Sequence, residues 1–136
     1  MKENQYSFIV NRIVAPQIKY NESDEYLKEK TVEPVVSYTA KVGNDRKSGN
    51  NLLYTCQLEA DIRVGKIHSI IVANGEIGVK DTVEISKAER EKILPQLLTP
   101  LMAKIAEIFA FLSGSNNPFP VILPGELGPV VISHDE

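Results

Sequence analysis

A long alternation of apolar and polar residues at positions 52–64 constrains the fold more than any other part of the sequence. A period of two residues is that of a β-strand, and one apolar face opposite a polar face is typical of an antiparallel sheet that is wet on one side. We therefore expect the apolar set of this strand to face a core. That set is Leu52, Tyr54, Cys56, Leu58, Ala60, Ile62 and Val64.

Three further segments are predicted strands. Residues 6–20 alternate imperfectly, because Arg12 stands among the apolar positions and Pro16 cannot donate a ladder hydrogen bond; a long edge strand with a bulge or kink explains both. Residues 34–42 alternate clearly. Residues 67–79 are apolar at both parities, which predicts a strand covered on both faces over part of its length. The apolar set of the first segment is Tyr6, Phe8, Val10, Val14, Ile18 and Tyr20.

Two helices are predicted after the strands. Ser86 and Glu89 form a capping box that opens a short charged helix, which we expect to end by Pro95. Thr99 and the proline after it restart a longer helix, which runs to about Leu112. This second helix lacks the broad polar face of a helix that lies on one sheet in a monomer. We therefore expect a homo-oligomer, a dimer or a tetramer, with the outer side of this helix at the interface. The outer residues are Ala103, Ala106, Ala110 and Phe111.

The order of these elements predicts an α+β fold. We expect a single domain over residues 1–136: a four-stranded antiparallel sheet, then a short helix and one long helix packed on it. The charged segment 21–33 and the polar segment 43–51 are expected to be loops. The proline-rich tail at 116–125 is expected to be extended and to pack along the surface.

Composition and charge narrow the possible functions. A hydrophobic fraction of 43% and a charged fraction of 24% are ordinary for a folded protein. A net charge of −3 gives no general attraction for nucleic acid or anionic lipid. We find no leader-like start and no uninterrupted apolar run of about 18 residues, so a cytoplasmic protein without membrane insertion is expected.

Residues that carry catalysis or bind metals are sparse. The two histidines, His68 and His134, have no sequence partner at metal-ligand spacing, and His134 is expected to fray with the acidic C-terminus. Cys56 is the only cysteine and falls on the core parity of its strand, so a buried, inert thiol is expected. We expect no enzyme activity, no cofactor and no metal.

Five short segments occur in the order and spacing of a known family: VNRIV at 10–14, EPVV at 33–36, ANGEI at 73–77, PLMAKIAE at 100–107 and FPVILP at 119–124. They resemble the motifs ERIYV, PEV, QAGIF, PNILFPYARE and FPPLNLAP of SecB, the bacterial export chaperone. The sequence looks most like the short, uncharacterised SecB-like proteins of low-GC Gram-positive bacteria. One departure is the stretch 126–131, whose Gly128 and Pro129 do not suit the second long helix of SecB.

The resemblance implies that the protein binds unfolded polypeptide in an apolar groove between the sheet, the loop at 21–33 and the segment at 119–123. In an alternative interpretation the tail seals the edge of the core. The protein would then be an oligomeric adaptor or structural protein that keeps the fold without binding clients. The residues that would line the groove are Tyr26, Leu27, Val32, Phe119, Val121 and Ile122.

Overall fold

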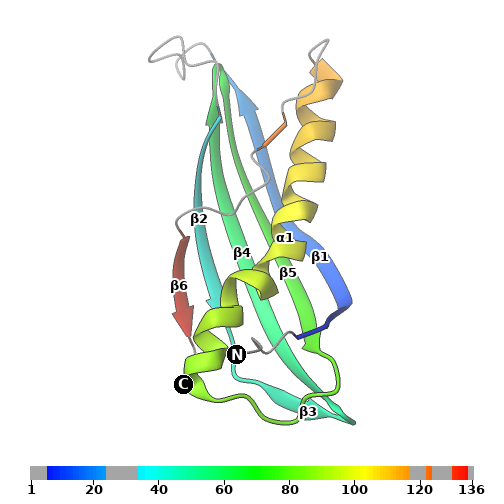
Figure 1. Cartoon of the computed structure of the whole chain (residues 1–136). Helices are drawn as coiled ribbons and strands as arrows, with labels where there is room; N and C mark the ends of the chain where they lie inside the picture. The colour runs from blue at the N-terminus through cyan, green and yellow to red at the C-terminus, as the bar shows by residue number, and fades with distance from the viewer. Residues whose placement is uncertain (1–5, 24–33, 117–121, 124–129, 135–136) are drawn as a thin grey trace.

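The computed structural model describes residues 6–23, 34–116, 122–123 and 130–134. In this part of the chain, one helix lies across one face of a twisted sheet (Figure 1). We call that face of the sheet the helix face. The elements in chain order are β1 (Phe8–Glu22), β2 (Val35–Val42), β3 (Arg46–Ser48), β4 (Asn51–Val64), β5 (Ile67–Val79), α1 (Lys87–Asn116) and β6 (Val130–His134).

The sheet has the strand order β1-β5-β4-β2-β6, with the short β3 paired to β4. The expected antiparallel core of β1, β5, β4 and β2 is confirmed. The loop expected at 43–51 contains β3. The expected frayed end is wrong for His134, because β6 pairs in parallel with β2 and places His134 beside Val42. A strand of five residues carries too short an alternation to be read from the sequence, and its partner is far away along the chain.

The alternation in β4 sets the core. Leu58, Ala60 and Ile62 are fully buried on the helix face, whereas Glu59 is exposed on the opposite face. They pack with the buried side of α1 in one cluster. The predicted face of this strand is therefore confirmed.

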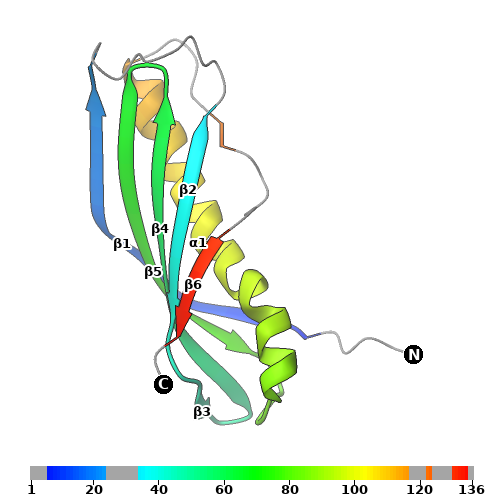
Figure 2. The ribbon, with the colours of Figure 1, turned by 90° about the vertical axis from the view of Figure 1, so that its left-hand side faces the viewer.

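β1 is an edge strand with two breaks in its pairing to β5. The register shifts between Val10 and Arg12 and again between Val14 and Gln17. Bulges bend a strand, and Figure 2 shows β1 changing direction in its first half. The bulged edge strand that Arg12 and Pro16 predict is confirmed.

β5 is buried on both faces over part of its length, as its sequence predicts. Ile71, Ala73 and Ile77 are fully buried on the helix face, and Val72 on the opposite face is almost as deeply buried. At Gly75 a side chain of α1 comes close to the sheet, since a Cβ atom there would lie 2.9 Å from Cδ1 of Leu101. The absence of a side chain at Gly75 therefore lets the helix lie close to the sheet.

The expected break between two helices is wrong, because α1 continues through Pro95 and Pro100. Its start is as predicted: the Ser86 hydroxyl oxygen accepts a hydrogen bond from the Glu89 backbone N–H at 3.3 Å. Thr99 does not cap a second helix, because its hydroxyl donates to the carbonyl of Pro95 at 3.0 Å. Apolar side chains before, between and after the prolines are buried in the core, and this packing holds the helix together despite the backbone hydrogen bonds that proline removes. They are Ile93, Leu94, Leu97, Leu98, Leu101 and Ile105.

The same helix is long and apolar enough, by length and composition alone, to cross a membrane over Lys87–Ser115. The core helix of a globular protein passes the same test. Here the buried side of α1 packs on β4 and β5, and Leu97, Leu98 and Phe109 are fully buried. Burial in the core therefore accounts for part of the hydropathy of α1, since 39% of its apolar window is buried.

Candidate functional site

The predicted groove falls mostly outside the described residues. Tyr26, Leu27, Val32, Phe119 and Val121 all lie there, so their place in a groove stays a prediction. Ile122 is described and is 71% exposed. Leu123, the next residue, is buried in the core cluster. The tail thus places one side chain in the core and one in solvent.

The predicted oligomer interface lies on the outer side of α1. Phe111 is 75% exposed and Ala103 is exposed, while Ala106 and Ala110 are half-buried. Phe109, two residues before Phe111, points the opposite way: it is fully buried, and its ring lies 6.1 Å from that of Tyr20 on β1. The outer side of α1 therefore presents small side chains and one large aromatic ring.

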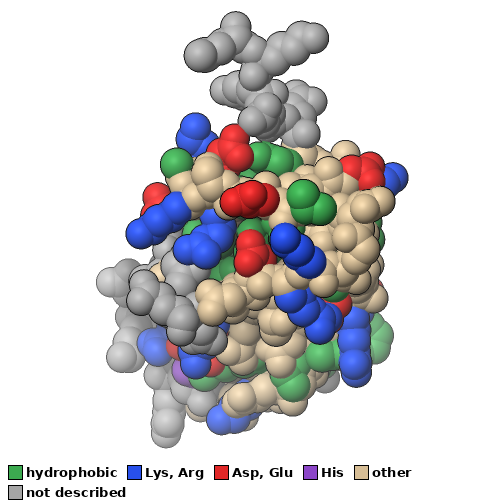
Figure 3. Space-filling view, turned by 90° about the horizontal axis from the view of Figure 1, so that it is seen from below, with side chains coloured by type: hydrophobic (Ala, Val, Ile, Leu, Met, Phe, Trp, Pro, Cys, Tyr) green, Lys and Arg blue, Asp and Glu red, His purple; other side chains and the backbone are tan. Residues whose placement is uncertain are grey.

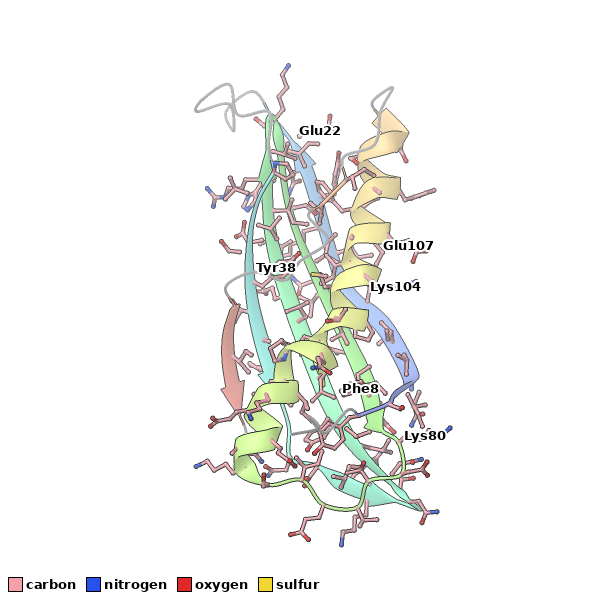
Figure 4. All side chains as sticks on the ribbon, viewed as in Figure 1. Phe8, Glu22, Tyr38, Lys80, Lys104 and Glu107 are labelled. Carbon is pink, nitrogen blue, oxygen red and sulfur yellow. The ribbon has the colours of Figure 1, made fainter. Side chains whose placement is uncertain are left out.

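Figure 4 shows Lys104 and Glu107 on the same stretch of α1. They are the charged residues of α1 between positions 96 and 116. Two charges leave most of the outer side of the helix uncharged, as its sequence predicts.

A second group of exposed apolar side chains lies on β1. Val10 and Ile18 are each 46% exposed, and Val14 is 38% exposed. The alternation of the sequence put these residues on an apolar face, but the structure does not bury them. One reason is their place: β1 forms the outer edge of the sheet, and only β5 flanks it. The expected single apolar face is also wrong, because the register shift after Val10 pairs Val14 with Asn74 on the face opposite to that of Val10 and Ile18.

The two flanks of the antiparallel core differ in regularity. β1 is interrupted by two register shifts and contains Pro16. β2 pairs with β4 through an unbroken register from Val35 to Val42, and its other side carries β6 over Tyr38 to Val42 (Figure 2). Bulges and proline discourage further strand pairing, whereas a regular edge invites it. β2 is therefore the more suitable strand for pairing with an extended chain.

Three polar residues of β4 and β5 form a cluster: Asp61, Arg63 and His68. Oδ1 of Asp61 accepts a hydrogen bond from Nε2 of His68 at 3.0 Å, and it lies 3.5 Å from Nε of Arg63. Sequence reasoning missed the pair because the β4–β5 register, not local spacing, brings the two residues together. The described part of the chain holds no group of three or more possible metal ligands.

Cys56 is buried, as predicted. Burial raises the pKa of its thiol from 9.0 to about 12, so the thiol stays protonated at neutral pH. A reactive cysteine needs access and a lowered pKa. The structure therefore offers no nucleophile at this position.

The end of the molecule seen in Figure 3 has a mixed surface. Acidic and basic side chains alternate there with small apolar patches. Such mixing is ordinary for a solvated surface. The exposed apolar residues of β1, of α1 and of the tail are therefore the better candidates for binding.

Comparison with known proteins tests the fold. No protein-family description matches the sequence, and neither does any curated protein. Among solved structures, a protein of unknown function from Streptococcus agalactiae is similar with a TM-score of 0.64 and 14% identity, over 89% of this chain and 99% of that one. A SecB-like chaperone from Mycobacterium tuberculosis, in complex with a ChAD peptide from the HigA1 antitoxin, is similar with a TM-score of 0.53 and 9% identity. That match covers 86% of this chain and 89% of the chaperone. The fold is SecB-like.

The likeness confirms the architecture that the sequence motifs imply: an antiparallel sheet followed by a long helix. At such low identity the likeness establishes the fold alone. The binding of a peptide belongs to the mycobacterial protein.

Proposed function

We propose that this protein is a SecB-like chaperone that binds unfolded or extended polypeptide and carries out no catalysis. The observation that carries the proposal is that large apolar side chains remain exposed on its SecB-like fold, among them Val10 and Ile18 on one face of β1 and Phe111 on α1. Exposed apolar patches usually mark binding surfaces. The peptide bound to the mycobacterial chaperone supports polypeptide as the class of ligand, by analogy of fold. The exposed residues of the strands, of α1 and of the tail are Val10, Val14, Ile18, Val35, Phe111 and Ile122.

The proposal includes a homo-oligomer, a dimer or a tetramer, in the cytoplasm. Its interface is the outer side of α1, with Ala103, Ala106, Ala110 and Phe111. The exposure of Phe111 supports this assignment, because an aromatic ring of that size gains most from burial when it meets a partner. A second copy of the chain would bury the same patch on both partners. Nucleic acid and membrane are not among the proposed partners.

Apolar burial would drive client binding. The affinity then comes from area removed from water, and the backbone of an extended client adds hydrogen bonds that tolerate many side chains. Moderate salt should weaken such binding little. ATP should not be needed, because the sequence has no GxxxxGK[ST] phosphate-binding loop.

The test is suppression of aggregation. Citrate synthase is unfolded at raised temperature with the wild-type protein in several-fold molar excess, without nucleotide, and light scattering is followed. We expect strong suppression. The double variant Phe119→Ala with Ile122→Ala should suppress aggregation less while leaving the oligomer intact. Val83→Ala is the matched control, since Val83 is exposed but lies in the connection between β5 and α1.

The second candidate function is an oligomeric adaptor that keeps the fold without clients. The burial of Leu123 in the core favours it, because part of the tail then serves to close the core. If the wild-type protein leaves citrate synthase aggregation unchanged, the chaperone proposal fails and the adaptor becomes the better account.

A further inference from the structure

The occupied edge of β2 suggests how a polypeptide would bind. All eight residues of β2 pair with β4 in continuous register, so the strand presents a regular row of backbone groups on its other side. Strand addition to a regular sheet edge is a common way of recognising extended peptides, because main-chain hydrogen bonds supply affinity. β6 occupies this edge.

β6 covers the edge only in part. Its five residues pair with Tyr38 to Val42, and β2 extends beyond that register at Val35, Val36 and Ser37. Val35, which lies beyond the register with β6, is 58% exposed. Among the described residues, β6 pairs with β2 alone. A short strand at an edge, paired with one neighbour, opens more easily than the strands of the core.

The register also indicates what the edge accepts. Ile132 pairs with Ala40, which is buried and has a small side chain, and Ile132 packs partly buried against the core. Thr39 and Lys41, on either side of Ala40, are exposed. A segment in this place therefore needs an apolar residue at the position of Ile132 and tolerates polar neighbours on both sides.

Tyr38, a residue of β2 that belongs to the core cluster, carries a buried hydroxyl. Tyr38 pairs with Val130 at the start of the β6 register, and its hydroxyl is buried without a hydrogen-bond partner in the described structure. Burial raises the pKa of Tyr38, so the hydroxyl stays protonated and able to donate.

We propose that β6 is a displaceable occupant of the β2 edge, and that an extended polypeptide with alternate apolar residues replaces it as the parallel partner of β2. This inference rests on the proposed function and adds the place and geometry of binding. β6 and the client then compete for one edge. The apparent affinity for a client is the intrinsic affinity multiplied by the fraction of molecules in which β6 has left.

The test locks β6 in place by a reversible bond. The register places Thr39 opposite Val131. Neighbouring strands lie about 4.8 Å apart, within the Cα separation that a disulfide spans. The full-length variant Thr39→Cys with Val131→Cys is oxidised to form the disulfide, and half of the sample is then reduced again. The locked (oxidised) form and the free (reduced) form therefore have the same sequence. Cys56 stays out of the reaction because it is buried.

Two probes are measured by fluorescence anisotropy: a labelled peptide with the sequence of residues 128–136, GPVVISHDE, and labelled, reduced and carboxymethylated α-lactalbumin. We expect the oxidised form to bind each probe at least about tenfold more weakly than the reduced form. The full-length variant Ile132→Asp should bind both probes more tightly than the wild type, by about threefold or more, because it loosens β6. Val83→Asp is its control and should bind like the wild type.

The outcomes separate the two proposals. Equal binding of α-lactalbumin by the oxidised and reduced forms overturns the displacement of β6 and leaves the chaperone proposal standing, with its site elsewhere. No binding of α-lactalbumin by any form overturns both. The freed β6 of one copy can also pair with the β2 edge of another copy. If the reduced form then sediments as a larger assembly than the oxidised form and binds no α-lactalbumin, that result also overturns displacement by a client.

Discussion

Replacing Gly75 with alanine tests how closely α1 approaches the sheet. The added Cβ atom would lie 2.9 Å from Cδ1 of Leu101 and 3.3 Å from the carbonyl oxygen of Arg12. Leu101 is fully buried, and the Arg12 oxygen belongs to the backbone of the neighbouring strand. Neither atom can move away without disturbing the core, so the substitution forces α1 and β1 apart.

The magnitude follows from two opposing effects. Overpacking a well-filled core costs about 1–3 kcal/mol. Removing the backbone freedom of a glycine in the unfolded chain returns about 0.4–1 kcal/mol. We expect Gly75→Ala to lower the free energy of unfolding by about 1–2 kcal/mol. Gly43→Ala is the control, because its Cβ atom would come no closer than 3.6 Å to its neighbour, and that variant should be neutral or slightly more stable.

Urea unfolding followed by circular dichroism measures both variants, and a double-mutant cycle locates the cause. Leu101→Ala alone should cost about 2–5 kcal/mol, as other buried leucines do. If the two side chains collide, the double variant should be more stable than the sum of the single effects predicts, by at least about 0.5 kcal/mol. Strict additivity, or a Gly75→Ala protein as stable as Gly43→Ala, would refute the reasoning.

The remaining predictions concern assembly and the β4 strand. Phe111→Lys should dissociate the oligomer in sedimentation experiments and leave the circular dichroism of the strands unchanged; a wild-type protein that sediments as a stable monomer at micromolar concentration contradicts this. Leu58→Ala should cost about 2–5 kcal/mol in urea unfolding, whereas Glu59→Ala should stay within about 0.5 kcal/mol of the wild type. A thiol reagent should modify Cys56 only after the protein unfolds. Rapid reaction of the native protein would make Cys56 a candidate nucleophile again. Because burial raises the pKa of Cys56 from 9.0 to about 12, the unfolded state loses its proton first. Stability should therefore fall as the pH rises from 9 towards 12, by at most about 1.4 kcal/mol per pH unit for this group. Cys56→Ala should reduce that slope, and an unchanged slope means that other groups cause it.

The strands of the core were predictable because their signal is local. Residues 52–64 and 67–79 alternate or stay apolar over their whole length, and the structure places strands over Asn51–Val64 and Ile67–Val79. The bulges of β1 followed from Arg12 and Pro16, which break the pattern at the positions where the register shifts. In each case the residues that decide the structure lie inside the element itself.

The rest depends on contacts that sequence patterns do not contain. Pro95 and Pro100 are strong helix breakers locally, yet buried leucines on either side of them keep α1 continuous. β6 is a strand because the edge of β2 is available to it. Val10 and Ile18 are exposed because the sheet ends at β1. The predicted groove residues fall mainly outside the described residues, so the structure leaves that part of the site as a prediction.

The pairing of the last strand with the second has a consequence for how the protein is made. A ribosome synthesises β2, β4, β5 and α1 before β6, so a newly made chain can assemble most of its core while the edge of β2 has no occupant. An open edge is where nascent chains join one another wrongly. β6 therefore closes this edge after the other described elements are in place. A variant without residues 130–134 would keep every molecule in the state in which the edge of β2 is open.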